Sequence, residues 1–152
     1  MWIEVFGTVR RYSAGLKASF GAKPTPKDAE RRAETAQLAF KHALAAIAPG
    51  RAASGIADAV QETFREAGYA VTPHHQSGYS IGIAFSPNQH EAGLFGLKRN
   101  NTRPLQEGMT LFPIANLYGP GATISASGMV LVTKSGSERL TKFEPLPEDL
   151  AR

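Results

Sequence analysis

The spacing of apolar residues along the chain changes from strand-like to helical and back to strand-like. Residues 2–6 combine aromatic and β-branched side chains, Gly7 and Thr8 can form a turn, and residues 9–12 can return as a second strand. Apolar positions then recur at helical spacing between residues 29 and 47, and again between residues 56 and 67. The pattern predicts a hairpin followed by two helices.

Proline, glycine and hydroxyl residues mark the expected helix boundaries. Thr25 lies between two prolines and can cap the first helix, because its side chain can accept a hydrogen bond from a free amide of the first turn. Pro49 and Gly50 are expected to end this helix. Ser54 should begin the second helix and Gly68 should end it.

The rest of the chain is predicted to be a sheet. Strands are expected at residues 69–71, 78–85, 109–117 and 129–133, and residues 140–143 should close the sheet after a turn at 134–137. A hairpin, a helix pair and several antiparallel strands indicate an α+β fold with both helices on one face of a curved antiparallel sheet. We assign residues 1–147 to this one domain and residues 148–152 to a C-terminal tail.

Composition narrows the class of protein. The 152 residues are 42% hydrophobic and 20% charged, which is ordinary for a globular domain, and the absence of cysteine excludes disulfides and thiolate metal sites. The net charge of +4 comes from basic residues that are spread along the chain, so we expect no nucleic-acid partner. Neither a signal pattern nor an apolar run of about 20 residues is visible, and we expect a cytoplasmic protein without a membrane partner.

Four short motifs follow one another in an informative order. They are Pro49-Gly50 with Ile56, the sequence GYSIG at 78–82, LQEGMT at 105–110 and VLVT at 130–133 followed by Gly136, Glu138, Leu140 and Thr141. These motifs resemble those of the pita-bread family of creatinase, aminopeptidase P and methionine aminopeptidase. The sequence of residues 78–83 is most similar to those of ectoine hydrolase-like and Xaa-Pro dipeptidase-like members. The resemblance implies the C-terminal portion of a pita-bread fold, and we expect an N-terminal truncation within the first half of that fold.

The resemblance also implies where metal ligands would stand. Most members of the family bind two divalent ions through two aspartates, a histidine and two glutamates. The matching positions here hold Glu4, Gly15, Tyr79, Ile114, and Ser127 or Gly128. Because each ion needs roughly four to six donors, we expect no metal and no other cofactor. Glu4 is expected to pair with Arg10 or Arg11 instead.

Creatinase-like chemistry remains available to such a chain, because creatinase hydrolyses a C–N bond without metal. The resemblance implies Glu91 as the substrate-binding carboxylate, with His90 beside it. His75 precedes Gly78 by three residues and can serve as general acid or base, and Tyr79, which stands where creatinase has its histidine, can donate a hydrogen bond to a developing oxyanion. The substrate would be a dipeptide or another small molecule of the ectoine or amidine type. Each residue also has a structural interpretation: an exposed loop for His74 and His75, core packing for Tyr79, and a solvated turn for His90 and Glu91.

A non-enzymatic function is the alternative. The missing part of the fold would leave apolar surface uncovered, and such surface favours association with a partner or a second copy. We therefore expect a homodimer, and the second hypothesis is an inactive pita-bread domain that acts in binding or assembly.

Overall fold

The computed structural model describes residues 2–19, 28–71, 76–83, 94–119 and 122–141. Within these ranges the elements follow one another as β1 (Trp2–Val9), β2 (Tyr12–Ser19), α1 (Ala29–Ala45), α2 (Ser54–Glu66), β3 (Gly78–Ser80), β4 (Thr110–Gly119), β5 (Ala122–Ser127), β6 (Val130–Thr133) and β7 (Gly136–Arg139). The boundary expected between residues 147 and 148 lies outside the described residues and stays a prediction.

The N-terminal hairpin is longer than predicted. β1 and β2 pair antiparallel over their whole length, from Trp2 opposite Ser19 to Val9 opposite Tyr12. The turn consists of Arg10 and Arg11, both at positive φ (49° and 73°), and its local twist suits a two-residue hairpin. The expected turn at Gly7 and Thr8 is wrong, because both residues pair within the ladder and the register decides the turn.

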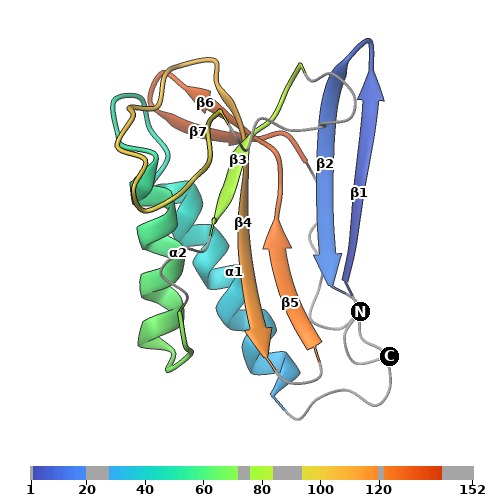
Figure 1. Ribbon diagram of the computed structural model, residues 1–152, viewed down its shortest axis with the longest axis vertical. Helices are drawn as coiled ribbons and strands as arrows, with labels where there is room; N and C mark the ends of the chain where they lie inside the picture. The colour runs from blue at the N-terminus through green and yellow to red at the C-terminus, as the bar shows by residue number, and fades with distance from the viewer. Residues whose placement is uncertain (1, 20–27, 72–75, 84–93, 120–121, 142–152) are drawn as a thin grey trace.

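The two helices pack side by side, with α1 against β4 and β5 and α2 on the far side of α1, at the left of Figure 1. α1 begins at Ala29, while its expected capping residue Thr25 lies outside the described residues. The predicted start of α2 at Ser54 is confirmed, and Gly68 follows its end at a φ of +83°. His42 on α1 is a structural residue: its Nδ1 lies 2.8 Å from Oγ1 of Thr63 on α2, so it ties the helices together.

β4 is the central strand of the main sheet. It pairs antiparallel with β3, β5 and β6, and β6 continues to β7. α1 packs against β4 and β5, which places the helices on one face of this sheet (Figure 1). The predicted α+β pita-bread architecture, with a helix pair on one face of an antiparallel sheet, is confirmed.

Several details of the predicted sheet differ from the structure. Residues 69–71 do not form a strand, and β5 was not predicted. β7 spans Gly136–Arg139, so the closing strand begins earlier than residues 140–143 and the turn is shorter than 134–137. The strand predicted at 78–85 is described only as far as Ile83, and within that part only β3 is a regular strand.

Side chains of β4 alternate between two apolar clusters, as the period of a strand requires. Leu111, Ala115 and Leu117 belong to the large core that contains the helices. Phe112 and Ile114 belong to a second, smaller cluster with Tyr79, Ile81 and Met129, against which Phe6 of β1 packs. We call this second group the inner cluster. It separates β4 from the N-terminal hairpin.

In the part of the chain that the structure describes, neither helix is both long enough and apolar enough to cross a lipid bilayer.

Candidate active site

The strands bring the expected ligand positions together. Ile114 on β4 lies directly opposite Ser127 on β5. Ser127 Oγ donates a hydrogen bond of 3.2 Å to the carbonyl oxygen of Lys17 on β2, and the amide of Ser125 donates one of 2.8 Å to Ser19 Oγ. These two hydrogen bonds hold β2 beside β5. Phe6 of β1 packs against the inner cluster, so the hairpin faces that cluster.

Gly15 stands at the second expected ligand position, and aromatic rings occupy the space beside it. A Cβ added to Gly15 would lie 2.7 Å from Phe6 and 3.3 Å from Phe112, which is too close to the Phe6 ring. The two rings pack edge to face, with centroids 6.0 Å apart and an interplanar angle of 66°. The space that an aspartate side chain would need at residue 15 is thus occupied by the apolar packing of Phe6.

Tyr79 stands at the histidine position and belongs to the inner cluster. Its ring centroid lies 5.6 Å from that of Phe112, and the residue is only 9% exposed. Burial, together with the nearby Glu4 carboxylate, raises the pKa of the Tyr79 phenol far above its usual value of 10.0. The hydroxyl therefore stays protonated at neutral pH, and it can donate a hydrogen bond but cannot act as a base.

Glu4 pairs with a residue that the sequence interpretation missed. It lies directly opposite Lys17 in the hairpin, and Lys17 Nζ is 3.8 Å from Glu4 Oε2. Burial lowers the pKa of Lys17, and the Glu4 carboxylate partly offsets this effect. The expected pairing of Glu4 with Arg10 or Arg11 is wrong, since both arginines form the turn. A turn placed at these arginines in the sequence would have put Glu4 opposite Lys17.

These side chains do not fit a pair of divalent ions. One carboxylate, a phenol that stays protonated and a serine hydroxyl are the remaining donors, while Ile114 and the Phe6 ring offer none. An ammonium group also lies beside the single carboxylate. Among the described residues, His, Cys, Asp and Glu nowhere gather in groups of three that could hold a metal ion.

The other predicted site residues, His75, His90 and Glu91, lie outside the described residues, and their roles stay predictions. The chain on either side of residues 84–93 lies beside the site. Ile83 forms a bridge with Tyr12 at the end of the hairpin. Phe95 accepts a hydrogen bond of 2.9 Å from the amide of Ser80, next to Tyr79.

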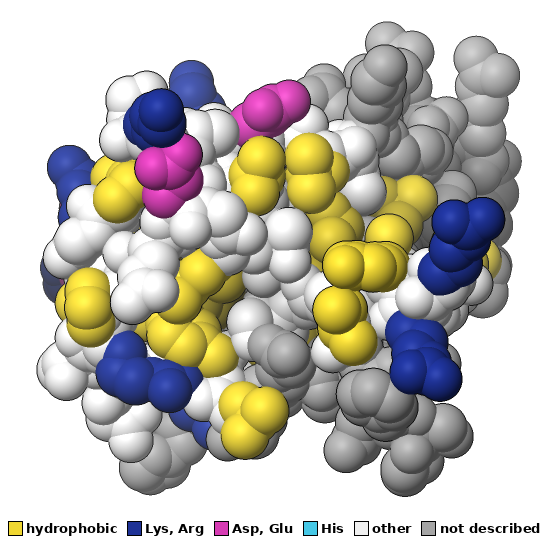
Figure 2. Space-filling model, turned by 90° about the horizontal axis from the view of Figure 1, so that it is seen from above, with side chains coloured by type: hydrophobic (Ala, Val, Ile, Leu, Met, Phe, Trp, Pro, Cys, Tyr) yellow, Lys and Arg dark blue, Asp and Glu magenta, His cyan; other side chains and the backbone are white. Residues whose placement is uncertain are grey.

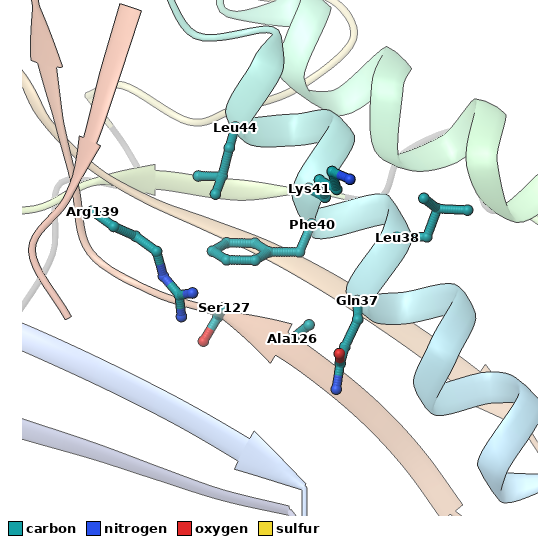
Figure 3. A pocket seen from close by; sticks show the side chains of 8 residues that line it. All are labelled: Gln37, Leu38, Phe40, Lys41, Leu44, Ala126, Ser127 and Arg139. Carbon is teal, nitrogen blue, oxygen red and sulfur yellow. The ribbon is translucent and has the colours of Figure 1, made fainter. Parts of the chain in front are cut away.

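A cavity of about 470 Å³ opens between α1, β5 and Arg139, and Ser127 is one of the residues that line it (Figure 3). Phe40 and Leu44 form much of its apolar wall, and the Arg139 guanidinium lies over the Phe40 ring at 5.3 Å from its centroid. Figure 2 shows one end of the molecule, where hydrophobic patches alternate with Lys and Arg side chains that stand apart from one another. The basic residues on that face do not gather into a single patch.

Comparison with known proteins shows which family this chain resembles. The sequence profile of metallopeptidase family M24 matches residues 1–134. An uncharacterised peptidase of Staphylococcus saprophyticus is 32% identical over 107 residues, which cover 70% of this chain and 29% of that protein. The chain therefore spans less than a third of the curated relative that it matches.

Solved structures agree on the fold. The prolidase of Pyrococcus furiosus superimposes with a TM-score of 0.83 at 24% identity, over 94% of this chain and 41% of that one. The methionine aminopeptidase of Thermotoga maritima superimposes with a TM-score of 0.75 at 18% identity, over 93% of this chain and 63% of that one. The profile match covers most of the sequence, and the solved structures share its strand and helix arrangement. The chain belongs to metallopeptidase family M24.

Proposed function

We propose that this chain belongs to a hydrolase that cleaves the C–N bond of a small peptide-like, ectoine-like or amidine substrate without bound metal ions. Family membership supports a peptidase-type hydrolase. The observation that carries the metal-free part is the Glu4–Lys17 ion pair beside the apolar inner cluster, in the place where members of the family are expected to hold their ions.

In this proposal the protein's own side chains supply the chemistry. The Tyr79 hydroxyl, which stays protonated, donates a hydrogen bond to the oxygen on which negative charge develops. His75 transfers the proton as general acid or base, Glu91 binds the cationic or amide part of the substrate, and His90 assists in binding. His90 and Glu91 come between Ile83 and Phe95 in the sequence, and both of these residues contact described parts of the site: Ile83 bridges Tyr12, and the carbonyl oxygen of Phe95 accepts a hydrogen bond from the Ser80 amide. These contacts support a role for His90 and Glu91.

Turnover assays test this proposal. Ectoine, creatine and X-Pro dipeptides would be offered to the purified protein, with and without a chelator. We expect turnover that a chelator does not reduce, and a loss of about a hundredfold in rate on Tyr79→Phe, which removes one donor to the oxyanion. Activity that a chelator abolishes would contradict metal independence. A Tyr79→Phe protein that turns over at the wild-type rate would remove Tyr79 from the mechanism.

A second candidate function is binding or assembly without catalysis. The cavity beside α1 favours it, because Phe40 and Leu44 line an open apolar hollow and the neighbouring Leu38 is 46% exposed. A homodimer is the assembly that we expect. Leu38→Glu should then shift the mass measured by light scattering to that of the monomer, while the matched control Leu94→Glu, at a leucine exposed elsewhere, should not. A wild-type protein that is already monomeric would contradict this candidate.

A further inference from the structure

Glu4 and Lys17 form a sheltered ion pair at the site. The residues are direct partners in the β1–β2 ladder, so both side chains leave the hairpin on the same face. The Lys17 side chain is only 8% exposed and that of Glu4 is 24% exposed. An ion pair this sheltered differs from the exposed Arg65–Glu62 and Arg99–Asp58 pairs on the surface.

Three of the expected ligand positions lie at or near this pair. Glu4 is itself the first of them. Its side chain leaves β1 on the same face as that of Phe6, which packs against the inner cluster that contains Tyr79, the third position. Ser127, at the last position, donates its hydroxyl hydrogen bond to the backbone of Lys17. Lys17 leaves β2 on the same face as Gly15, whose added Cβ would meet Phe6 and Phe112, so its ammonium lies on the side of the hairpin that faces these positions.

We infer that the Lys17 ammonium is the resident cation of this site, which neutralises Glu4, holds its carboxylate in place and keeps divalent ions out. The inference rests on the proposed metal-free function and states how the site manages without ions. A carboxylate that is largely removed from water requires a counter-charge. Two divalent ions suit a cluster of several carboxylates, whereas a single carboxylate is balanced by one ammonium. Lys17 is thus a positioning residue that acts through Glu4.

Reversal of the Lys17 charge gives a direct test. In Lys17→Glu two carboxylates face each other across the hairpin, and hard cations prefer paired oxygen donors. Mn²⁺ binding would be followed by electron paramagnetic resonance on the wild type, Lys17→Glu and Glu4→Gln/Lys17→Glu. The matched control is Arg65→Glu, which creates a carboxylate pair with Glu62 on the exposed surface of α2. We expect Lys17→Glu to bind Mn²⁺ at least tenfold more tightly than the other three proteins.

The outcomes separate the inference from the proposed function. A folded Lys17→Glu protein that binds Mn²⁺ no better than Arg65→Glu would overturn the inference and leave the metal-free function intact. Wild-type protein that binds Mn²⁺ as tightly as Lys17→Glu, and at least tenfold more tightly than Arg65→Glu, would contradict the metal-free function together with the inference. The two results therefore cannot be confused.

A double-mutant cycle covers the case in which Lys17→Glu does not fold. Lys17→Met leaves the Glu4 carboxylate without this counter-charge, and Glu4→Gln/Lys17→Met removes both charges. We expect the urea midpoint to fall more in Lys17→Met than in the double variant, and Lys17→Arg to restore most of the loss. Equal midpoints for Lys17→Met and the double variant would show that Lys17 does not neutralise Glu4, and would overturn the inference.

Discussion

The Glu4 carboxylate and the Lys17 ammonium lie 3.8 Å apart across the N-terminal hairpin, at the place where other members of this fold are expected to hold metal ions. Burial and, to a smaller extent, the Glu4 carboxylate raise the pKa of Tyr79, which is a member of the inner cluster. The other strands of the site contribute Ile114, Phe112 and Ser127. The protein has thus kept the scaffold of the family while the chemical character of its centre has changed.

The packing of Phe6 over Gly15 leads to the first prediction. Gly15→Ala places a methyl group 2.7 Å from the Phe6 ring, and such overpacking lowers the free energy of unfolding by about 1–3 kcal/mol. Gly7→Ala is the matched control in the same hairpin, because no atom lies within 4 Å of its added Cβ. Urea denaturation measures both. Equal effects of the two substitutions would argue against the close contact between Phe6 and Gly15.

Gly78, which precedes Tyr79, should be the least replaceable glycine of the site. Its φ is +122°, and an added Cβ would lie 2.2 Å from the carbonyl oxygen of Phe112, a backbone atom that cannot rotate away. We expect Gly78→Ala to lower the free energy of unfolding by about 2–5 kcal/mol, from strain and overpacking together.

A matched control separates these two causes at Gly78. Gly108 also has a positive φ (+86°), but no atom lies within 4 Å of its added Cβ. Gly108→Ala should therefore cost only about 1–2 kcal/mol of conformational strain. Thermal unfolding of both variants provides the comparison, and a Gly78→Ala protein as stable as Gly108→Ala would contradict the close approach of β3 to β4.

Because of Lys17, the free energy of unfolding should increase as the pH rises. The pKa of Lys17 is lowered by folding, so the unfolded chain binds more protons between the folded value and the ordinary value of 10.5. The free energy of unfolding should therefore increase as pH rises through that window. Urea midpoints measured at increasing pH on the wild type and on Lys17→Met test this, and the rise should be absent from Lys17→Met.

Tyr79 has the opposite effect at still higher pH. Folding raises the pKa of its phenol, so above its ordinary value of 10.0 the unfolded chain loses this proton while the folded protein keeps it. Stability should fall as pH increases beyond that value, and the Tyr79 contribution to this fall should be absent from Tyr79→Phe. A Tyr79→Phe protein with the same alkaline decline as the wild type would contradict the burial of a protonated phenol.

Much of the fold could be predicted because local patterns agreed with it. The helical spacing of α1 and α2, the glycine that follows α2 and the β-branched run of β6 all leave local signals. β5 does not, because its sequence ATISAS consists mainly of small and hydroxyl residues that resemble a loop. Its strand conformation comes from pairing with β4, a tertiary effect that overrides weak propensity.

The centre of the site was harder to predict for a different reason. The residues Gly15, Tyr79 and Ile114, at the positions where the resemblance places metal ligands, could be read directly from the sequence. The role of Lys17 could not, because its partner depends on the turn, and Gly7 offers a stronger local turn signal than Arg10 and Arg11 do. A shift of the turn along the chain changes which residue faces Glu4. The ion pair therefore emerges only once the hairpin register is known.

The most direct test of the account is the metal content and metal response of the purified wild-type protein. Elemental analysis and thermal unfolding, with and without excess Mn²⁺ or a chelator, would be carried out on the same preparation. We predict less than a stoichiometric amount of bound metal and a melting temperature that neither addition changes, because the lone carboxylate already has Lys17 as its counter-charge. Two tightly bound ions per chain, with a melting temperature that falls on chelation, would contradict it.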